Sequence, residues 1–96
     1  MKIRLKFQPG DLVVTNSIAE MIAENRDFNN FVAASYQRYL RCDWGDMCAE
    51  DKKLNRKSLK TNQSLHGVYK YSDEITIWII TEWDRSKTTI LLPHER

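Results

Sequence analysis

The chain has 96 residues, of which 42% are hydrophobic and 29% are charged, and its formal net charge is +2 at pH 7. This length and composition predict one domain, residues 1–96, with its own core, and argue against a disordered chain. The small net charge neither demands nor excludes a nucleic-acid partner, and no apolar run reaches the roughly 20 residues that cross a membrane.

The first residues alternate in character. Three apolar residues alternate with basic residues over positions 2–7, which is typical of a half-buried edge strand. The segment lacks the continuous apolar stretch of a signal peptide, so we expect a cytoplasmic protein with reduced cysteines. A turn follows at residues 8–11, and residues 12–15 either pair back as a second short strand or lead into the first helix.

The first predicted helix is short. Thr15 or Asn16 can cap it, Ser17 and Glu20 fit a capping box, and the helix ends near Asn25. Apolar residues recur at helical spacing and give it one buried face. The members of this face are Ile18, Met21 and Ile22.

The second helix is predicted over residues 28–41, with Asp27 as its cap. Its apolar stripe is the most regular in the chain, so we expect this helix to lie across the sheet. The stripe comprises Phe28, Phe31, Val32, Ser35 and Tyr39, with Tyr36 and Leu40 beside it.

A third helix is predicted over residues 47–60, after a break at which Gly45 permits a positive φ. Asp43 or Asp46 can cap it. Its apolar face is thin, so the helix should be largely solvated. A band of basic residues follows it, namely Lys52, Lys53, Arg56, Lys57 and Lys60.

Three strands are predicted at the C-terminus, over residues 64–71, 75–81 and 88–92, and they form an antiparallel meander that Pro93 ends. The fold class is therefore α+β, with this meander and a short N-terminal strand or hairpin covered by two to three helices. Pairing Thr81 with Thr88 places isoleucines on one face and Trp78 with Ile80 on the other. Either the N-terminal segment covers this second face, or it is a contact surface through which a homodimer forms.

The sequence offers little catalytic chemistry. The two Cys and two His residues lack the spacing of a zinc site, and the Gly residues are too far apart for a phosphate loop. We therefore expect no metal, no cofactor and no enzymatic activity. The segment Glu82-Trp83-Asp84-Arg85 could do acid–base work, bind a partner, or rigidify the hairpin by pairing Arg85 with a carboxylate and stacking it on Trp83.

Two segments together resemble a known group of proteins. The first is residues 42–47 with Glu50-Asp51-Lys52 and Leu54-Asn55, and the second is residues 77–86 with residues 88–93. They resemble small uncharacterised proteins labelled plasmid-related, which are carried on conjugative elements and plasmids of Firmicutes. The similarity covers nearly the whole chain, although the ending His94-Glu95-Arg96 departs from the acidic-aromatic tail of that group.

The resemblance implies a context and no catalytic residue or cofactor. Small accessory proteins of mobile elements often act by binding, as anti-restriction or anti-CRISPR inhibitors or as regulators of transfer. Our first hypothesis is therefore a non-enzymatic inhibitor of a host defence complex, a protein or ribonucleoprotein, which it contacts through Trp44, Trp83, Asp84 and Arg85. The alternative is a nucleic-acid-binding accessory or regulatory protein that uses the basic helix at 47–60.

Overall fold

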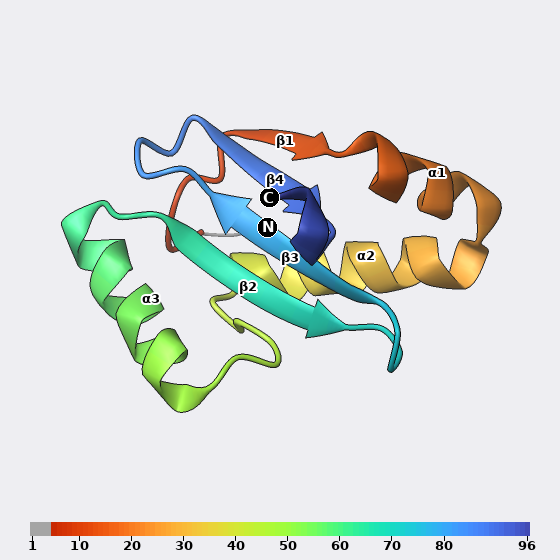
Figure 1. The fold of residues 1–96 in the computed structure, drawn as a ribbon. Coiled ribbons are helices and arrows are strands. Elements are labelled where there is room, and N and C mark those ends of the chain that lie inside the picture. The colour runs from red at the N-terminus through yellow and green to blue at the C-terminus, as the bar shows by residue number, and fades with distance from the viewer. Residues whose placement is uncertain (1–4) are drawn as a thin grey trace.

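A computed structural model describes residues 5–96, in which the first two helices pack on one face of a four-stranded sheet and the third lies along one edge of it (Figure 1). The strand order is β1-β4-β3-β2, with β1 parallel to β4 and the remaining pairs antiparallel. This arrangement confirms the predicted α+β class. The elements are β1 (Asp11–Val14), α1 (Asn16–Glu24), α2 (Arg26–Leu40), α3 (Ala49–Thr61), β2 (Leu65–Lys70), β3 (Thr76–Thr81), β4 (Lys87–Leu91) and the 3-10 turn η1 (Pro93–Glu95).

Strands β3 and β4 have the register that we considered from the sequence, whereas the sequence does not determine the register of β2. Thr81 pairs with Thr88 and Ile79 with Ile90, so the isoleucines of β3 and β4 share the face that the helices cover. On β2 the same face carries Leu65 and Tyr69, which are fully buried. The alternation of a half-buried sheet therefore determined which side chains enter the core.

Two N-terminal segments were considered as strands, and the second of them, residues 12–15, coincides with the observed strand except for one residue at each end. Of the first segment, residues 2–4 lie outside the described part and residues 5–7 form no strand. The strand is β1, which pairs with β4 in parallel instead of turning back on the N-terminus. Gly10 adopts a φ of +67°, and its ideal Cβ would lie 2.4 Å from the Ser86 backbone, so the chain approaches β4 closely at this turn.

The two long N-terminal helices share one capping residue. Thr15 caps α1 as predicted, whereas Ser17 is already inside the helix and makes no capping box with Glu20. Asn25 ends α1 and caps α2, because its Oδ1 accepts a hydrogen bond from the Phe28 amide at 3.1 Å. The predicted cap, Asp27, instead lies in the first turn of α2, where its charge suits the helix dipole.

A chain of hydroxyl groups joins α2 to the sheet inside the core. The hydroxyls of Tyr39 and Thr81 lie 2.7 Å apart, and those of Thr81 and Thr88 also lie 2.7 Å apart. Thr88 donates its proton to the Pro9 carbonyl at 2.6 Å, so each earlier hydroxyl donates to the next one in the chain. The three hydroxyls of this chain are thereby satisfied, and burial raises the pKa of Tyr39 well above its usual range.

The second face of the sheet is covered in part by the C-terminus. The turn η1 lies against β3 (Figure 1), and the Glu95 carboxylate accepts hydrogen bonds from the Thr15 hydroxyl and the Leu92 amide, both at 2.8 Å. Within the described part of the N-terminal segment, Phe7 packs in the helix-side core and not on this face. Ile80 is buried and Trp78 half-buried, so less of the predicted contact surface is open than the sequence suggested. In the described residues, no helix is both long and apolar enough to cross a membrane.

The edge of the sheet at β2 is closed by polar contacts. Asn55 of α3 donates to the His66 carbonyl and accepts from the His66 amide at 3.2 Å. The next outward-facing residue, Val68, bonds the Trp44 carbonyl at 3.1 Å and the Asp46 amide at 2.7 Å. The outer backbone groups of β2 are therefore paired, as buried polar groups require.

Candidate functional site

The loop between α2 and α3 turns Trp44 into the core. Arg38 pairs with Asp43 at 2.8 Å, and the Asp43 carboxylate also accepts a hydrogen bond from the Gly45 amide at 3.1 Å. Trp44 is only 2% exposed, and its ring packs edge-on against Tyr39. The prediction that Trp44 is an exposed binding anchor is therefore wrong, because its side chain is buried.

The same contacts explain why α3 lacks the predicted cap. The Asp43 carboxylate pairs with Arg38, and the Asp46 carboxylate accepts from the Lys70 amide at 2.9 Å, so neither reaches the start of α3. Cys48 takes the N-cap position without a side-chain hydrogen bond. The bond from Arg38 and the Gly45 amide lower the pKa of Asp43, which stays ionised and committed to this loop.

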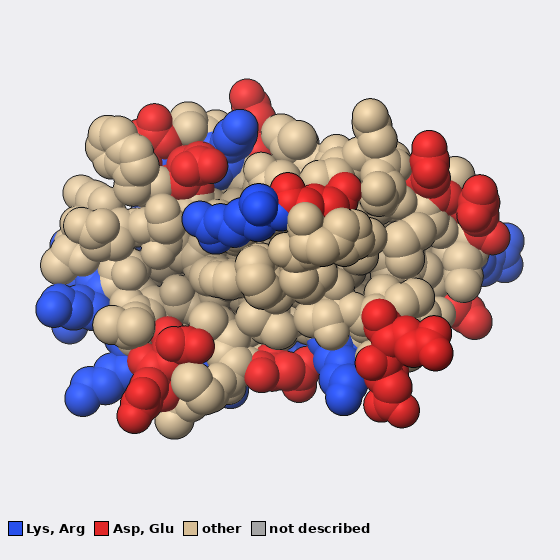
Figure 2. All heavy atoms as spheres, viewed as in Figure 1, with Lys and Arg blue, Asp and Glu red and all other residues tan. Residues whose placement is uncertain are grey.

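Asn55 determines which face of α3 points outward. It is the buried residue of this helix, and its side-chain amide hydrogen-bonds to the backbone of His66 at the β2 edge. The basic residues on the other side of the helix are consequently exposed, apart from the half-buried Lys52. Figure 2 shows Lys and Arg side chains along the outer margin of α3, with acidic side chains near the start of that helix.

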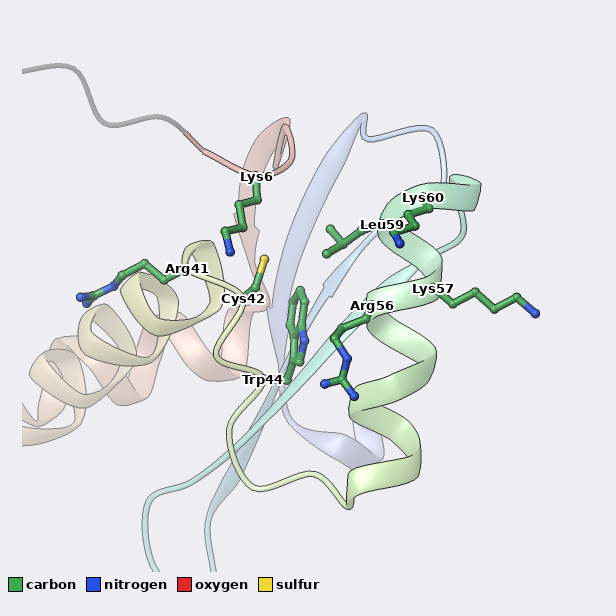
Figure 3. A pocket seen from close by; sticks show the side chains of 8 residues that line it. All are labelled: Lys6, Arg41, Cys42, Trp44, Arg56, Lys57, Leu59 and Lys60. Atoms are coloured by element: carbon green, nitrogen blue, oxygen red, sulfur yellow. The ribbon is translucent and has the colours of Figure 1, made fainter.

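A cationic hollow lies between the C-terminal end of α2 and α3 (Figure 3). Its volume is about 630 Å³, which is within the size range of ligand pockets in proteins. Cys42, Trp44 and Leu59 form its apolar part, and none of the carboxylates in residues 5–96 lines it. The cations that line it are Lys6, Arg41, Arg56, Lys57 and Lys60.

The positive charge of this hollow is uncompensated. In residues 5–96 the ion pairs are Arg38–Asp43 and Lys70–Asp73, so none of the lining cations is in an ion pair there. Arg41 and Lys57 extend outward at opposite sides, whereas Lys6 points toward Cys42 (Figure 3). Burial raises the pKa of the Cys42 thiol against the opposing effect of Lys6, so this thiol is protonated near neutral pH. The arrangement suits binding of an anion better than nucleophilic chemistry.

The loop between β3 and β4 is fastened to the end of α3 by Arg85. Its guanidinium donates to the Gln63 carbonyl at 2.7 Å, to the Glu82 carbonyl at 3.1 Å and to the Ser58 carbonyl at 3.2 Å. Arg85 thus has the structural use considered from the sequence, although its acceptors are backbone carbonyls and not a carboxylate. The half-buried Arg85 is committed to these contacts and is a poor candidate for a free binding anchor.

Trp83 and Asp84 stand at the exposed tip of this loop. Trp83 is 63% exposed, which is the highest value among the large hydrophobic residues described. Asp84 is also exposed, and hydrogen bonds with Ser86 lower the pKa of its carboxyl group. Because Arg85 bonds the Ser58 carbonyl, the loop that carries the exposed indole lies against the C-terminal end of α3.

The structure thus brings together only part of the predicted set. Trp83 lies near the C-terminal end of α3, whereas Trp44 is buried beneath the hollow. Sequence reasoning missed Lys6 and Arg41, because they join the helix cations only through tertiary packing. It also missed Asn55. This residue could have been noticed as a polar side chain on the thin apolar face of α3.

Across residues 5–96, no group of three His, Cys, Asp or Glu residues is placed to hold a metal ion. His66 stacks edge-on against Trp78 with ring centroids 4.8 Å apart, and its Nε2 has no partner among the described groups.

No family model, no curated protein and no solved structure matches the chain. The resemblance to plasmid-related proteins stays a prediction.

Proposed function

We propose that this protein is a non-enzymatic binding protein for single-stranded nucleic acid. The proposal rests on the cations of α3 and the adjoining hollow, none of which is in an ion pair within residues 5–96, and on the exposed Trp83 in the loop that Arg85 joins to the end of α3. Proteins that bind single strands without sequence preference combine a positive surface for the phosphates with aromatic rings on which bases stack. The first hypothesis from the sequence, a protein contact, loses two of its four anchors, because Trp44 is buried and Arg85 bonds within the chain.

The two parts of the surface have different tasks. Arg56, Lys57 and Lys60 belong both to the basic band of α3 and to the hollow, so they are the central phosphate contacts. Trp83 offers a stacking platform, whereas the nearby carboxylates of Glu82 and Asp84 repel phosphates. Bases, and not the sugar–phosphate chain, should therefore meet the tip of the loop.

Fluorescence anisotropy with labelled single-stranded DNA, single-stranded RNA and duplex DNA over a range of salt concentrations tests the proposal. We expect single strands to bind more tightly than duplex, with an affinity that falls steeply with salt. The variant R56E/K60E should weaken binding at least about tenfold and flatten the salt dependence by about 0.7 in slope for each phosphate that the variant no longer neutralises.

The matched control is R26E/K70E, which makes the same change in net charge at exposed positions away from the hollow. It should retain most of the affinity. Equal losses of affinity in the two variants would mean that binding depends on net charge and not on the position of the cations. No binding of any nucleic acid at low salt would contradict the proposal. Trp83→Ala should weaken binding by about 1–3 kcal/mol if a base stacks there.

A second candidate is a protein–protein contact centred on Trp83, as in an inhibitor of a host defence complex of the anti-CRISPR or anti-restriction type. The observation that favours it is the exposure of Trp83 on a rigid loop, because Trp residues dominate the energy of many interfaces. Mixing with purified host defence complexes tests it, and Trp83→Ala should abolish inhibition while Arg56→Glu leaves it intact. The opposite pattern would favour nucleic-acid binding.

A further inference from the structure

The outer edge of β1 is uncovered by the rest of residues 5–96. Leu12, Val13 and Val14 are 49%, 41% and 36% exposed, and β1 lies at the end of the strand order. Between Asp11 and Val14 there is no Lys, no Pro and no bulge, the usual features by which proteins keep an edge strand from pairing. An apolar edge of this kind is a template for another strand.

The pairing of β1 with β4 determines which of its backbone groups point toward the open edge. The amides of Asp11 and Thr15 donate to the Ser86 and Ile90 carbonyls, both at 3.1 Å. Since alternate residues of a strand point their backbone groups to the same side, Val13 also faces β4. Leu12 and Val14 therefore present both N–H and C=O groups to the open edge.

We propose that two copies of this chain pair through their β1 strands, antiparallel, about a two-fold axis at Val13. In this register Leu12 of one copy opposes the partner's Val14, and each such pair exchanges two backbone hydrogen bonds. Val13 opposes the partner's Val13 as a non-hydrogen-bonded pair. Only apolar side chains then face each other on both sides of the joined sheet, and Asp11 has no like charge opposite it.

The other edge of the sheet, at β2, cannot accept an added strand. Two copies can therefore pair only through β1, and the assembly stops at a dimer. At β2 the outward groups of His66 and Val68 are bonded to Asn55, Trp44 and Asp46, so β1 of another chain cannot add to that edge. A two-fold pairing of β1 with itself uses the open edge of both copies at once. The result is a closed dimer and not a filament.

This interface is independent of the proposed nucleic-acid surface. Helix α3 lies beside β2, at the opposite edge of the sheet from β1 (Figure 1). Pairing through β1 leaves the cations of α3 and the Trp83 loop open on both copies. A dimer without nucleic-acid binding, or the reverse, would separate the two proposals.

Cysteine cross-linking tests the register in a background in which Cys42 and Cys48 are replaced by Ala and Ser. Two Val13 residues facing each other across the axis have Cα atoms about 4.5 Å apart, which is within reach of a disulfide. We expect V13C to form a covalent dimer rapidly, L12C alone to do so slowly, and L12C/V14C to cross-link like V13C. The exposed α2 position in A33C provides the control for random collision, and cross-linking of V13C no faster than A33C would overturn the proposal.

Sedimentation velocity of the full chain supplies a measurement without cross-linking. The wild type should move from the 11.4 kDa monomer toward twice that mass as its concentration rises. Val13→Lys places two like charges opposite each other at an exposed position and should leave a folded monomer at every concentration. A wild type that stays monomeric at near-millimolar concentration, or a Val13→Lys variant that dimerises equally well, would overturn the proposal.

Discussion

The two edges of the sheet differ in how their backbone groups are satisfied. At β2, a side-chain amide from α3 and the loop before that helix occupy the outward N–H and C=O groups. At β1, the corresponding groups face outward beside exposed apolar side chains. One edge thus contributes to the stability of the domain, whereas the other remains available for association, and the difference lies in long-range contacts and not in strand composition.

The largest expected effect is at Gly45, which holds the loop against β2. Gly45 has a φ of +81°, and its ideal Cβ would lie 1.9 Å from the Val68 carbonyl oxygen. Gly45→Ala should therefore destabilise the protein by about 3 kcal/mol or more, through backbone strain and a steric clash. Urea unfolding followed by circular dichroism measures this loss, and an effect below about 1 kcal/mol would show that the loop does not close the edge tightly.

Asn55→Ala should have the next largest effect. The substitution leaves the amide and carbonyl of His66 without their partner and removes the main polar link between α3 and the sheet. We expect a loss of about 2–3 kcal/mol, since unsatisfied buried groups cost about 1–3 kcal/mol. Arg56→Ala, at an exposed neighbouring position of the same helix, is the control and should change stability by no more than about 0.5 kcal/mol.

A smaller effect is expected from the protonation of His66 on β2. Burial lowers the pKa of His66, with Arg96 adding to the shift and Asp51 opposing it. The unfolded chain, with an ordinary His pKa of about 6.5, therefore takes up the proton first as pH falls. The free energy of unfolding should decline below about pH 6.5 and continue to decline until the folded protein is also protonated.

His66→Phe should flatten this decline, because the ring remains while the titrating group is lost. His94→Gln, at an exposed position, should leave it unchanged. Chemical unfolding between about pH 5 and 7 measures the slope, and this window excludes most titration of the carboxyl groups. The same slope in His66→Phe as in the wild type would assign the pH dependence to another group.

The smallest effect is expected at the open edge. Val13→Thr should change the stability of the monomer by about 0.5 kcal/mol or less, because the side chain is already substantially exposed. Ile80→Thr, on the same face of the sheet but buried, should cost clearly more. Thermal unfolding at low protein concentration compares the two variants, and equal losses would mean that β1 is as well packed as β3.

The cationic site shows how far the sequence could lead. The basic band of α3 was visible at helical spacing, and its exposure follows from the thin apolar face of that helix. The hollow was not visible, because Lys6 and Arg41 come from distant segments that meet only after α2 packs on the sheet. The sequence also could not show that Trp44 is buried and Trp83 exposed, because each lies in a loop next to an acidic residue. Only packing distinguishes them.

The sequence by itself determined the elements whose pattern is local. Alternating β-branched residues predicted which side chains of β3 and β4 share a face, and helical periodicity predicted the buried stripe of α2. Thr15 was one of two residues expected to cap α1. Only the tertiary structure decided the parallel pairing of β1, the burial of Trp44 and the closure of the β2 edge by Asn55. These features depend on contacts between distant segments, whose free energy is absent from any short stretch of the chain.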